Sequence, residues 1–269
     1  MEQIKMMIKK YEELEFRDDF MFGKVMQDKE LCRDVLECLL QRPVGELSDI
    51  DSQKEFRCTS DGKPIKLDIY TRDDQEIYDA EMQNKGHKTL EDLALPKRSI
   101  FYQSSIDTDY MEKGYHYKKL PDSKVLFICT FDPFEKGLAM YTFTGRCEED
   151  NSIAIDDGST RIFYNCTYKG NDLPEDIGKF YEYVETGKCS DVLTKRIDEA
   201  VQEARKKEEW RSDYMKERVL IMDAIEEERR NTERERQNTE RERTRANIAE
   251  EQVKKLKARV IELESQVNA

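Results

Sequence analysis

The stretch KPIKLDIYTRDDQEIYDAEMQ, residues 63–83, decides the fold. Apolar and polar residues alternate along it on both sides of Asp73 and Asp74, which predicts a β-hairpin with these two aspartates as its turn. In that register Asp68 lies opposite Asp79. Because side chains alternate between the two faces of a strand, one face of the hairpin is apolar and the other is polar. The polar face carries Lys66, Asp68, Tyr70, Ile77, Asp79, Glu81 and Gln83.

Two carboxyl groups on the polar face are placed to act together. The predicted register puts Glu81 opposite Lys66 and diagonal to Asp68, with the Cα atoms of the two acidic residues about 7–8 Å apart. Carboxylates at that separation can converge on one divalent cation, and oxygen ligands of this kind suit Mg²⁺ or Mn²⁺. Gln83 points to the same side, and its amide can donate to a phosphate or hold an attacking water. Because the pattern D…ExQ is short, ordinary polar alternation on a surface sheet is the alternative interpretation.

The composition limits the class of protein. The chain has 269 residues, of which 39% are charged and 37% hydrophobic, and its net charge is −13. Residues 1–190 hold 27 basic and 39 acidic residues, a net charge of −12, which argues against strong nonspecific DNA binding through bulk charge. The seven cysteines form no C-x-x-C and only two histidines accompany them, so we expect a reducing compartment rather than a zinc site. No run of about 18 apolar residues and no signal-peptide pattern occurs, so we expect an unexported, cytoplasmic protein with no membrane partner.

Two helices are predicted on either side of the hairpin from apolar spacing and capping residues. Residues 28–41 should form a helix with Asp28 as its N-cap, because apolar residues recur on one side of it. After Pro96, residues 97–114 should form a second helix, which Gly114 closes.

Strands follow the second helix. The three β-rich runs are KVLFICTF, LAMYTFT and RIFYNCTY, and a helix at 172–187 comes next, ended by Gly187. Helices and strands alternate irregularly up to about residue 190. This pattern predicts one α/β or α+β domain made of residues 1–190.

The C-terminal part of the chain has a helical pattern throughout. Residues 191–230 should form a helical extension, and residues 231–269 open with a seven-residue repeat, NTERERQ followed at once by NTERERT. Apolar residues beyond the repeat are spaced alternately three and four apart, with Val at heptad position a and Leu at d, which favours a parallel two-stranded coiled coil and hence a homodimer. A solvated or frayed helix is the alternative, because little more than three heptads carry the signal. The seam residues are Ala246, Ala249, Val253, Leu256, Val260, Leu263 and Val267.

An ordered series of motifs runs through the first part of the chain: DFMF at 19–22, KLDIY at 66–70, YDAEMQ at 78–83, KRSIFYQSSID at 97–107, GYHYKKLPDSKVLFICTFDPF at 114–134 and KFYEYV at 179–184. Such a series over most of a domain is far more specific than D…ExQ alone. It resembles a known family, the Rpn-like (recombination-promoting nuclease) group of PD-(D/E)XK nuclease family transposases. The resemblance implies a restriction-endonuclease-like fold for residues 1–190, with a mixed central sheet flanked by helices.

The resemblance also implies roles for particular residues. Asp68 and Glu81 would be metal ligands, and Asp19 a further ligand, directly or through water. Asp18 competes with Asp19 for that role, and either could instead cap the helix that follows. Gln83 stands where the wider superfamily carries lysine, which leaves the general base open; a water activated by the phosphate itself is one candidate.

Arg98 and Tyr102 are candidates for substrate binding. They are four residues apart, so they share one face of the predicted helix. If that face covers the hairpin, Arg98 could contact phosphate through its bidentate fork, and Tyr102 could position the phosphate or the metal ligands. The alternative is structural, with the arginine stem lying over the edge of the core and the tyrosine packed within it.

These observations predict a DNA endonuclease that depends on Mg²⁺ or Mn²⁺ and dimerises through its C-terminal coiled coil. A dimer with two active sites could cut both strands. The resemblance implies genetic mobility or defence against foreign DNA as the setting. Two other classes stay open. One is a catalytically inactive module that binds nucleic acid or protein, and the other is an assembly protein whose helical tail is the working part.

Overall fold

The computed structural model describes residues 9–56, 65–84, 89–112 and 116–267. The chain divides into two compact units. One extends to Arg211 and contains the sheet, and the other begins at Ser212.

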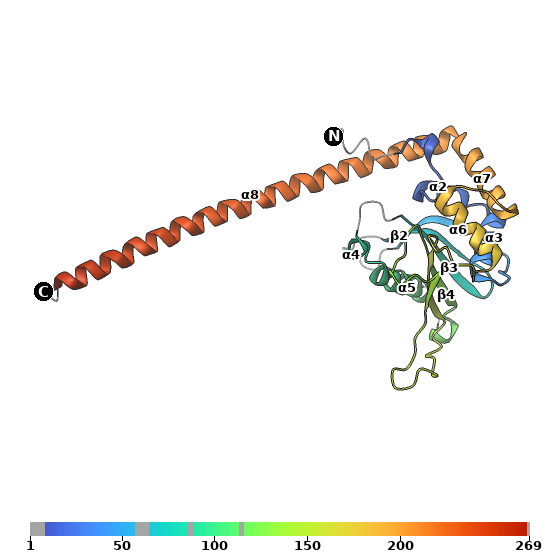
Figure 1. Cartoon of the computed structure of the whole chain (residues 1–269), viewed down its shortest axis with the longest axis horizontal. Helices are drawn as coiled ribbons and strands as arrows, with labels where there is room; N and C mark the ends of the chain where they lie inside the picture. The colour runs from blue at the N-terminus through green and yellow to red at the C-terminus, as the bar shows by residue number, and fades with distance from the viewer. Residues whose placement is uncertain (1–8, 57–64, 85–88, 113–115, 268–269) are drawn as a thin grey trace. The chain divides into compact units, whose positions relative to one another are not determined.

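A mixed six-stranded sheet is the centre of the first unit, in the order β1-β2-β3-β4-β6-β5 (Figure 1). β1, β2 and β3 pair antiparallel, β3, β4 and β6 pair parallel, and β5 pairs antiparallel with β6. This confirms the predicted mixed sheet, while β1 was not predicted. The strands are β1 (Asp51–Phe56), β2 (Ile65–Arg72), β3 (Glu76–Gln83), β4 (Asp122–Cys129), β5 (Met140–Phe143) and β6 (Ser159–Asn165).

β2 and β3 form the predicted hairpin, but its turn lies one residue later than expected. Arg72 pairs with Ile77, so Asp74 and Gln75 are the central turn residues. The cause is the Asp73 carboxylate, which accepts hydrogen bonds from the backbone N–H groups of two residues beyond it, both at 2.8 Å. An aspartate does this from the first position of a turn rather than from its centre.

The predicted register is therefore wrong by two residues. Tyr70, and not Asp68, lies opposite Asp79. The predicted opposition of Lys66 and Glu81 is wrong for the same reason. A shift of two residues leaves every side chain on its predicted face, because the faces alternate with a period of two. The grouping of Asp68 with Glu81 on one face is thus unaffected by the error.

Helices cover both faces of the sheet (Figure 1). On β4, Phe127 faces α5, where it stacks on the ring of Tyr102 with centroids 6.0 Å apart. On the opposite face, the Tyr164 hydroxyl of β6 donates to the Leu39 carbonyl of α3 at 3.0 Å. The helices are α2 (Asp19–Val25), α3 (Lys29–Leu40), α4 (Leu90–Leu93), α5 (Leu95–Glu112), α6 (Glu175–Thr186) and α7 (Val192–Arg205), with 3₁₀ turns η1 (Tyr11–Glu13) and η2 (Tyr117–Lys119).

The predicted start of one helix and the predicted end of another are confirmed. Asp28 caps α3, accepting from the Leu31 N–H at 2.9 Å, and Gly187 ends α6 with a φ of 75°. α5 already begins before Pro96, which sits in its first turn, where the missing N–H of proline costs nothing. The predicted closure at Gly114 lies outside the described residues.

α7 packs against α2, α3 and α6 through a buried apolar stripe. Ile197, Val201 and Ala204 recur at helical spacing and are each 1% exposed or less. The Arg205 guanidinium also donates twice to the Leu14 carbonyl, at 2.9 and 2.7 Å. These contacts make α7 part of the unit that contains the sheet.

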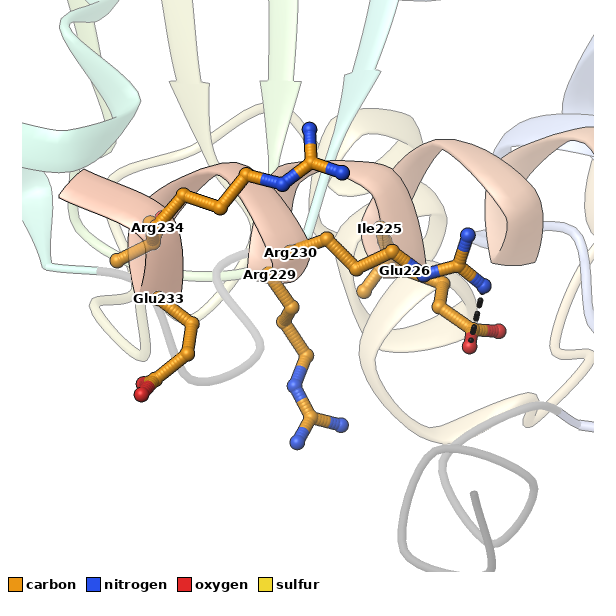
Figure 2. Close-up of a pocket in the computed structure, with 7 residues that line it drawn as sticks. Ile225, Glu226, Arg229, Arg230, Glu233 and Arg234 are labelled. Atoms are coloured by element: carbon orange, nitrogen blue, oxygen red, sulfur yellow. Dashed lines mark hydrogen bonds and ion pairs between the residues drawn. The ribbon is translucent and has the colours of Figure 1, made fainter. Parts of the chain in front are cut away.

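α8 (Glu208–Val267) is one continuous helix of 60 residues. Glu226 and Arg230, four residues apart, form an ion pair at 3.0 Å, which Figure 2 shows on the helix surface. The hollow drawn there is lined by side chains of α8 alone, and one helix cannot enclose a ligand. On the heptad seam, the side chains of Val253, Leu256 and Val260 are exposed, by 49%, 66% and 52%. The coiled coil stays a prediction.

Within the described ranges, no helix combines the length and the apolar character that a membrane crossing requires.

Candidate active site

The hairpin brings two acidic side chains together at the point where its strand pairing ends. The described pairing of β2 with β3 stops at Ile69 and Ala80. Just beyond, the Asp68 N–H donates to Glu81 Oε1 at 2.8 Å, and the Met82 N–H donates to Asp68 Oδ2 at 3.1 Å. Each carboxylate thus accepts a hydrogen bond from a backbone N–H of the other strand. This exchange holds both side chains at the end of the hairpin.

A cavity of about 410 Å³ lies over this end of the hairpin. It brings together most of the residues that the sequence singled out: Asp19 of α2, Asp68 of β2, Glu81 and Gln83 of β3, and Arg98 of α5. Tyr102 does not line it, but lies one turn along α5 from Arg98. The remaining lining residues are Lys66, Met82, Asn84, Asp92 and Leu93.

The structure separates the two neighbouring aspartates at the start of α2. Asp18 Oδ2 accepts hydrogen bonds from Lys9 Nζ and from the Glu15 N–H, both at 2.8 Å. Its side chain does not cap α2. Asp19 is the exposed first residue of the helix and lines the cavity, where its negative charge acts on Asp68. Of the two, Asp19 is therefore the one placed beside the other acids.

Arg98 organises the other side of the cavity. Its Nη1 donates to Gln83 Oε1 at 2.8 Å, and its Nη2 lies 3.4 Å from Glu81 Oε2. The Tyr102 hydroxyl accepts from Nη2 at 2.7 Å and from Nε at 3.1 Å. The guanidinium also lies over the rings of Tyr102 and Phe127, 5.3 and 5.8 Å from their centroids. Although 32% of the Arg98 side chain is exposed, its guanidinium group is directed at these protein partners.

These bonds fix the orientation of the Gln83 amide. Because Arg98 can only donate, the oxygen of the amide must face the guanidinium. The amide nitrogen then points to Glu81 Oε2, 3.5 Å away. Gln83 thus presents a donor beside the acidic pair, and it cannot accept a proton as a base.

Burial and mutual repulsion perturb the acids. Burial raises the pKa of Asp68 well above its ordinary value, and the negative charges of Glu81 and Asp19 raise it further. Asp68 keeps some solvent access through the cavity although protein surrounds it. Burial also raises the pKa of Glu81, followed by the charge of Asp79, and the positive charge of Arg98 only partly opposes this rise. Neutral or cation-bound forms of these carboxyl groups are therefore favoured over bare carboxylates.

Asp79 is a functional candidate that sequence reasoning left without a role. It is completely buried two residues before Glu81, on the same face of β3. Among the described residues no permanent donor reaches either of its carboxylate oxygens. Glu81 is its hydrogen-bonding neighbour, and it can donate only when it is protonated. The signal for Asp79 was present in the polar alternation of the strand, but burial could not be inferred from it.

The oxygen atoms at the cavity are of the kind that binds a hard divalent cation. Asp19, Asp68 and Glu81 offer carboxylate oxygens, and no described residue donates to Asp68 Oδ1. In the part of the chain that the structure describes, no three His, Cys, Asp or Glu side chains are already gathered closely enough to hold a metal ion. Binding would therefore need the side chains to draw together, which the exposed Asp19 can do.

Tyr102 lies behind this cluster. Burial raises the pKa of its hydroxyl to about 12, so the phenol stays protonated at neutral pH. It can therefore accept from Arg98 while keeping its own proton to donate. Its ring packs against Phe127 in the core, as the structural interpretation of this residue expected.

Residues 15–142 match the family model described as PD-(D/E)XK nuclease family transposase. The matched segment contains every residue that lines the cavity. This confirms the resemblance found in the motifs, and the mixed sheet with flanking helices is consistent with the fold of that family. The match supports a nuclease-like or transposase-like function. No curated protein and no solved structure matches the chain.

Proposed function

We propose that this protein, whose residues 15–142 match the model of the PD-(D/E)XK nuclease family transposases, is a metal-dependent endonuclease that hydrolyses phosphodiester bonds of DNA. The observation that carries the proposal is that acids from α2, β2 and β3 line one cavity beside an oriented amide. The family description also supports genetic mobility as the setting, with defence against foreign DNA as the other candidate.

Asp68 and Glu81, joined by Asp19, would hold the cation, Mg²⁺ or Mn²⁺. A cation bound there would supply Lewis-acid stabilisation of the negative charge that develops on the scissile phosphate. The protein's own contribution is to hold Asp68 and Glu81 through reciprocal bonds to the backbone of β2 and β3. This keeps both side chains in place before any ligand arrives.

Gln83 would donate its amide N–H to the phosphate or to the attacking water, because Arg98 keeps the amide nitrogen turned toward Glu81. Arg98 and Tyr102 act here as positioning residues. Their direct contact with phosphate stays a prediction, since Arg98 would have to release Gln83 or Glu81 to make it.

A homodimer joined by α8 would place two such sites in one particle. The seam around Leu256 supports this, because its exposed apolar side chains form an apolar hollow on the helix. We also propose a cytoplasmic location, which the free thiols support. These are Cys32, Cys38, Cys129, Cys147, Cys166 and Cys189.

A second candidate function is a module that binds nucleic acid or protein without cutting. Its support is the contact of Arg98 with Glu81, since the guanidinium already offsets part of the charge that a cation would offset. In that case DNA binding would persist in EDTA and no metal would give cleavage.

The test is the cleavage of supercoiled plasmid by the purified full-length chain with Mg²⁺ or Mn²⁺. We expect nicked and linear products, and Asp68→Asn and Glu81→Gln should each lower the rate at least about a hundredfold, since the cation supplies several kcal/mol. Asp49→Asn is the matched control, because Asp49 is exposed and does not line the cavity. Cleavage at the wild-type rate by both site variants would remove the proposal.

A further inference from the structure

Lys66 lines the cavity without a partner among the described residues. Of the described residues, Lys66 and Arg98 supply the positive charges of the lining. Arg98 is taken up by Gln83, Glu81 and Tyr102. The ammonium of Lys66, by contrast, has no ion-pair or hydrogen-bond partner anywhere in residues 9–56, 65–84, 89–112 and 116–267.

The strand places Lys66 on the side of the acids. It precedes Asp68 by two residues in β2, so both side chains leave the same face of the strand. Lys66 is exposed and lies near the start of the strand, where its four-carbon stem can turn the ammonium toward the cavity or away from it. The ammonium can therefore change position while staying close to the cavity.

The balance of charge in the lining says what this ammonium is suited to meet. Four acidic residues, Asp19, Asp68, Glu81 and Asp92, line the cavity together with Lys66 and Arg98. Carboxylates repel an approaching phosphate, so a positive charge that they do not neutralise favours its approach. Because Lys66 pairs with none of these four acids within the described residues, its three donors are available to an anionic ligand.

We propose that Lys66 contacts the phosphate backbone of DNA at this cavity and stabilises the negative charge that develops on the phosphate during cleavage. The inference rests on the proposed function in that DNA is the substrate. The two basic side chains would then have different roles. Arg98 fixes the geometry of Glu81 and Gln83, and Lys66 contacts the substrate. A lysine suits that task, because its ammonium is a compact charge on a flexible stem that can follow the phosphate.

The experiment compares Lys66→Gln and Lys66→Arg with Lys118→Gln, a matched control at an exposed lysine of η2 outside the cavity. Two measurements are made on the full-length chain. The first is the single-turnover rate of plasmid cleavage with Mn²⁺, and the second is the affinity for a labelled DNA duplex with Ca²⁺, by fluorescence anisotropy over a series of salt concentrations. Circular dichroism and thermal unfolding confirm that each variant is folded.

We expect Lys66→Gln to lower the cleavage rate about tenfold or more and to reduce the slope of log affinity against log salt by about 1, as the loss of one phosphate contact does. Lys66→Arg should restore the slope, and Lys118→Gln should behave as the wild type. A wild-type rate and slope in Lys66→Gln would overturn the inference. Equal slope changes in both glutamine variants with unchanged cleavage would also overturn it, by assigning the effect to general surface charge.

The two proposals fail in different ways. A wild-type protein that binds the duplex but cuts with neither Mg²⁺ nor Mn²⁺ overturns the nuclease assignment, while the salt slope of Lys66→Gln still decides the phosphate contact. A wild-type protein that does not bind the duplex overturns both.

Discussion

The carboxyl group of Asp79 is buried, and burial disfavours its charged form. The side chain is fully buried, and within the described structure neither of its oxygens meets a permanent hydrogen-bond donor. Burial raises the pKa of Asp79, and the charge of Asp68 raises it further. Glu81 and Asp68 are shifted in the same direction. The folded protein therefore binds protons at these sites more tightly than the unfolded chain does.

This makes the stability of the metal-free protein dependent on pH in a defined direction. A carboxyl group whose pKa is raised by folding contributes its full stability below the unfolded pKa, about 4, and loses it as the pH rises toward the folded pKa. Asp79→Asn removes one such group while keeping its shape. In EDTA we expect the variant to be more stable than the wild type at pH 7, by about 1–3 kcal/mol, and nearly equal to it at pH 4. Urea unfolding at a series of pH values measures the difference.

The comparison with the wild type is needed because other acids work in the opposite direction. Hydrogen bonds outweigh burial at Asp73 and Asp132 and hold their pKa values below normal, so both groups lose stability as the pH falls. Those contributions cancel between the two proteins. A difference in stability that is the same at pH 4 and pH 7 would contradict the burial argument for Asp79.

Much of the candidate site could be predicted from residue spacing, and the rest depended on packing. Asp68, Glu81 and Gln83 share a face because strand side chains alternate, and this holds for any register shifted by an even number. The partners of Arg98 could not be predicted, since they depend on how α5 lies over β3. A helical pattern places Arg98 beside Tyr102 but does not say which oxygens its nitrogens reach.

At the scale of elements, the hairpin turn shows how one side chain sets a register. The Asp73 carboxylate accepts from the N–H groups of Gln75 and Glu76, from the Gly45 N–H at 3.0 Å, and from the Tyr78 hydroxyl at 2.9 Å. Two adjacent aspartates both favour a turn, so the sequence alone does not say which one stands first. The bond from Gly45, a residue far away in the chain, also favours Asp73, and local sequence does not reveal it.

Removing the Asp73 carboxylate should therefore cost more than removing its neighbour. Asp73→Ala leaves three backbone N–H groups without this acceptor, while the Tyr78 hydroxyl keeps Glu76 Oε2 at 3.1 Å, and we expect the free energy of unfolding at pH 7 to fall by about 1–3 kcal/mol. Asp74→Ala is the matched control, because Asp74 is exposed and accepts only a long bond of 3.3 Å from the Gln75 side chain. Chemical denaturation of both variants gives the comparison. Equal losses in the two would show that the carboxylate of Asp73 is not what holds the turn.

β1 is a strand that the sequence pattern does not predict. Its sequence, DSQKEF, has a single apolar residue, so no alternation marks it as a strand. It forms because β2 offers an unpaired edge, and its backbone pairs antiparallel along that edge. Polar edge strands of this kind depend on a partner strand rather than on their own pattern.

At the scale of the whole molecule, α8 carries a surface that a solitary helix does not need. Val253, Leu256 and Val260 are exposed and, with Lys257, line an apolar hollow on the helix. The seven-residue repeat before them, which begins at residue 231, is polar at the same heptad positions, with Thr232 and Thr239 at position a. An apolar seam over the last heptads of a helix is typical of a helix that pairs there.

Self-association should therefore depend on Leu256, which occupies position d. Leu256→Gln buries an unmatched amide in a coiled coil and should weaken the dimer by about 2 kcal/mol or more, which raises its dissociation constant about thirtyfold. Lys254→Gln, at the outward position b, is the matched control and should leave the dimer unchanged. Sedimentation velocity over a range of concentrations measures both.

If each cavity acts on one strand, the Leu256→Gln monomer should still nick plasmid but should linearise it in two separate encounters, so that nicked circles accumulate first. A wild-type chain that sediments as a monomer at every concentration contradicts the coil, and linear product that forms without a nicked intermediate in the monomeric variant contradicts the division of strands between two sites.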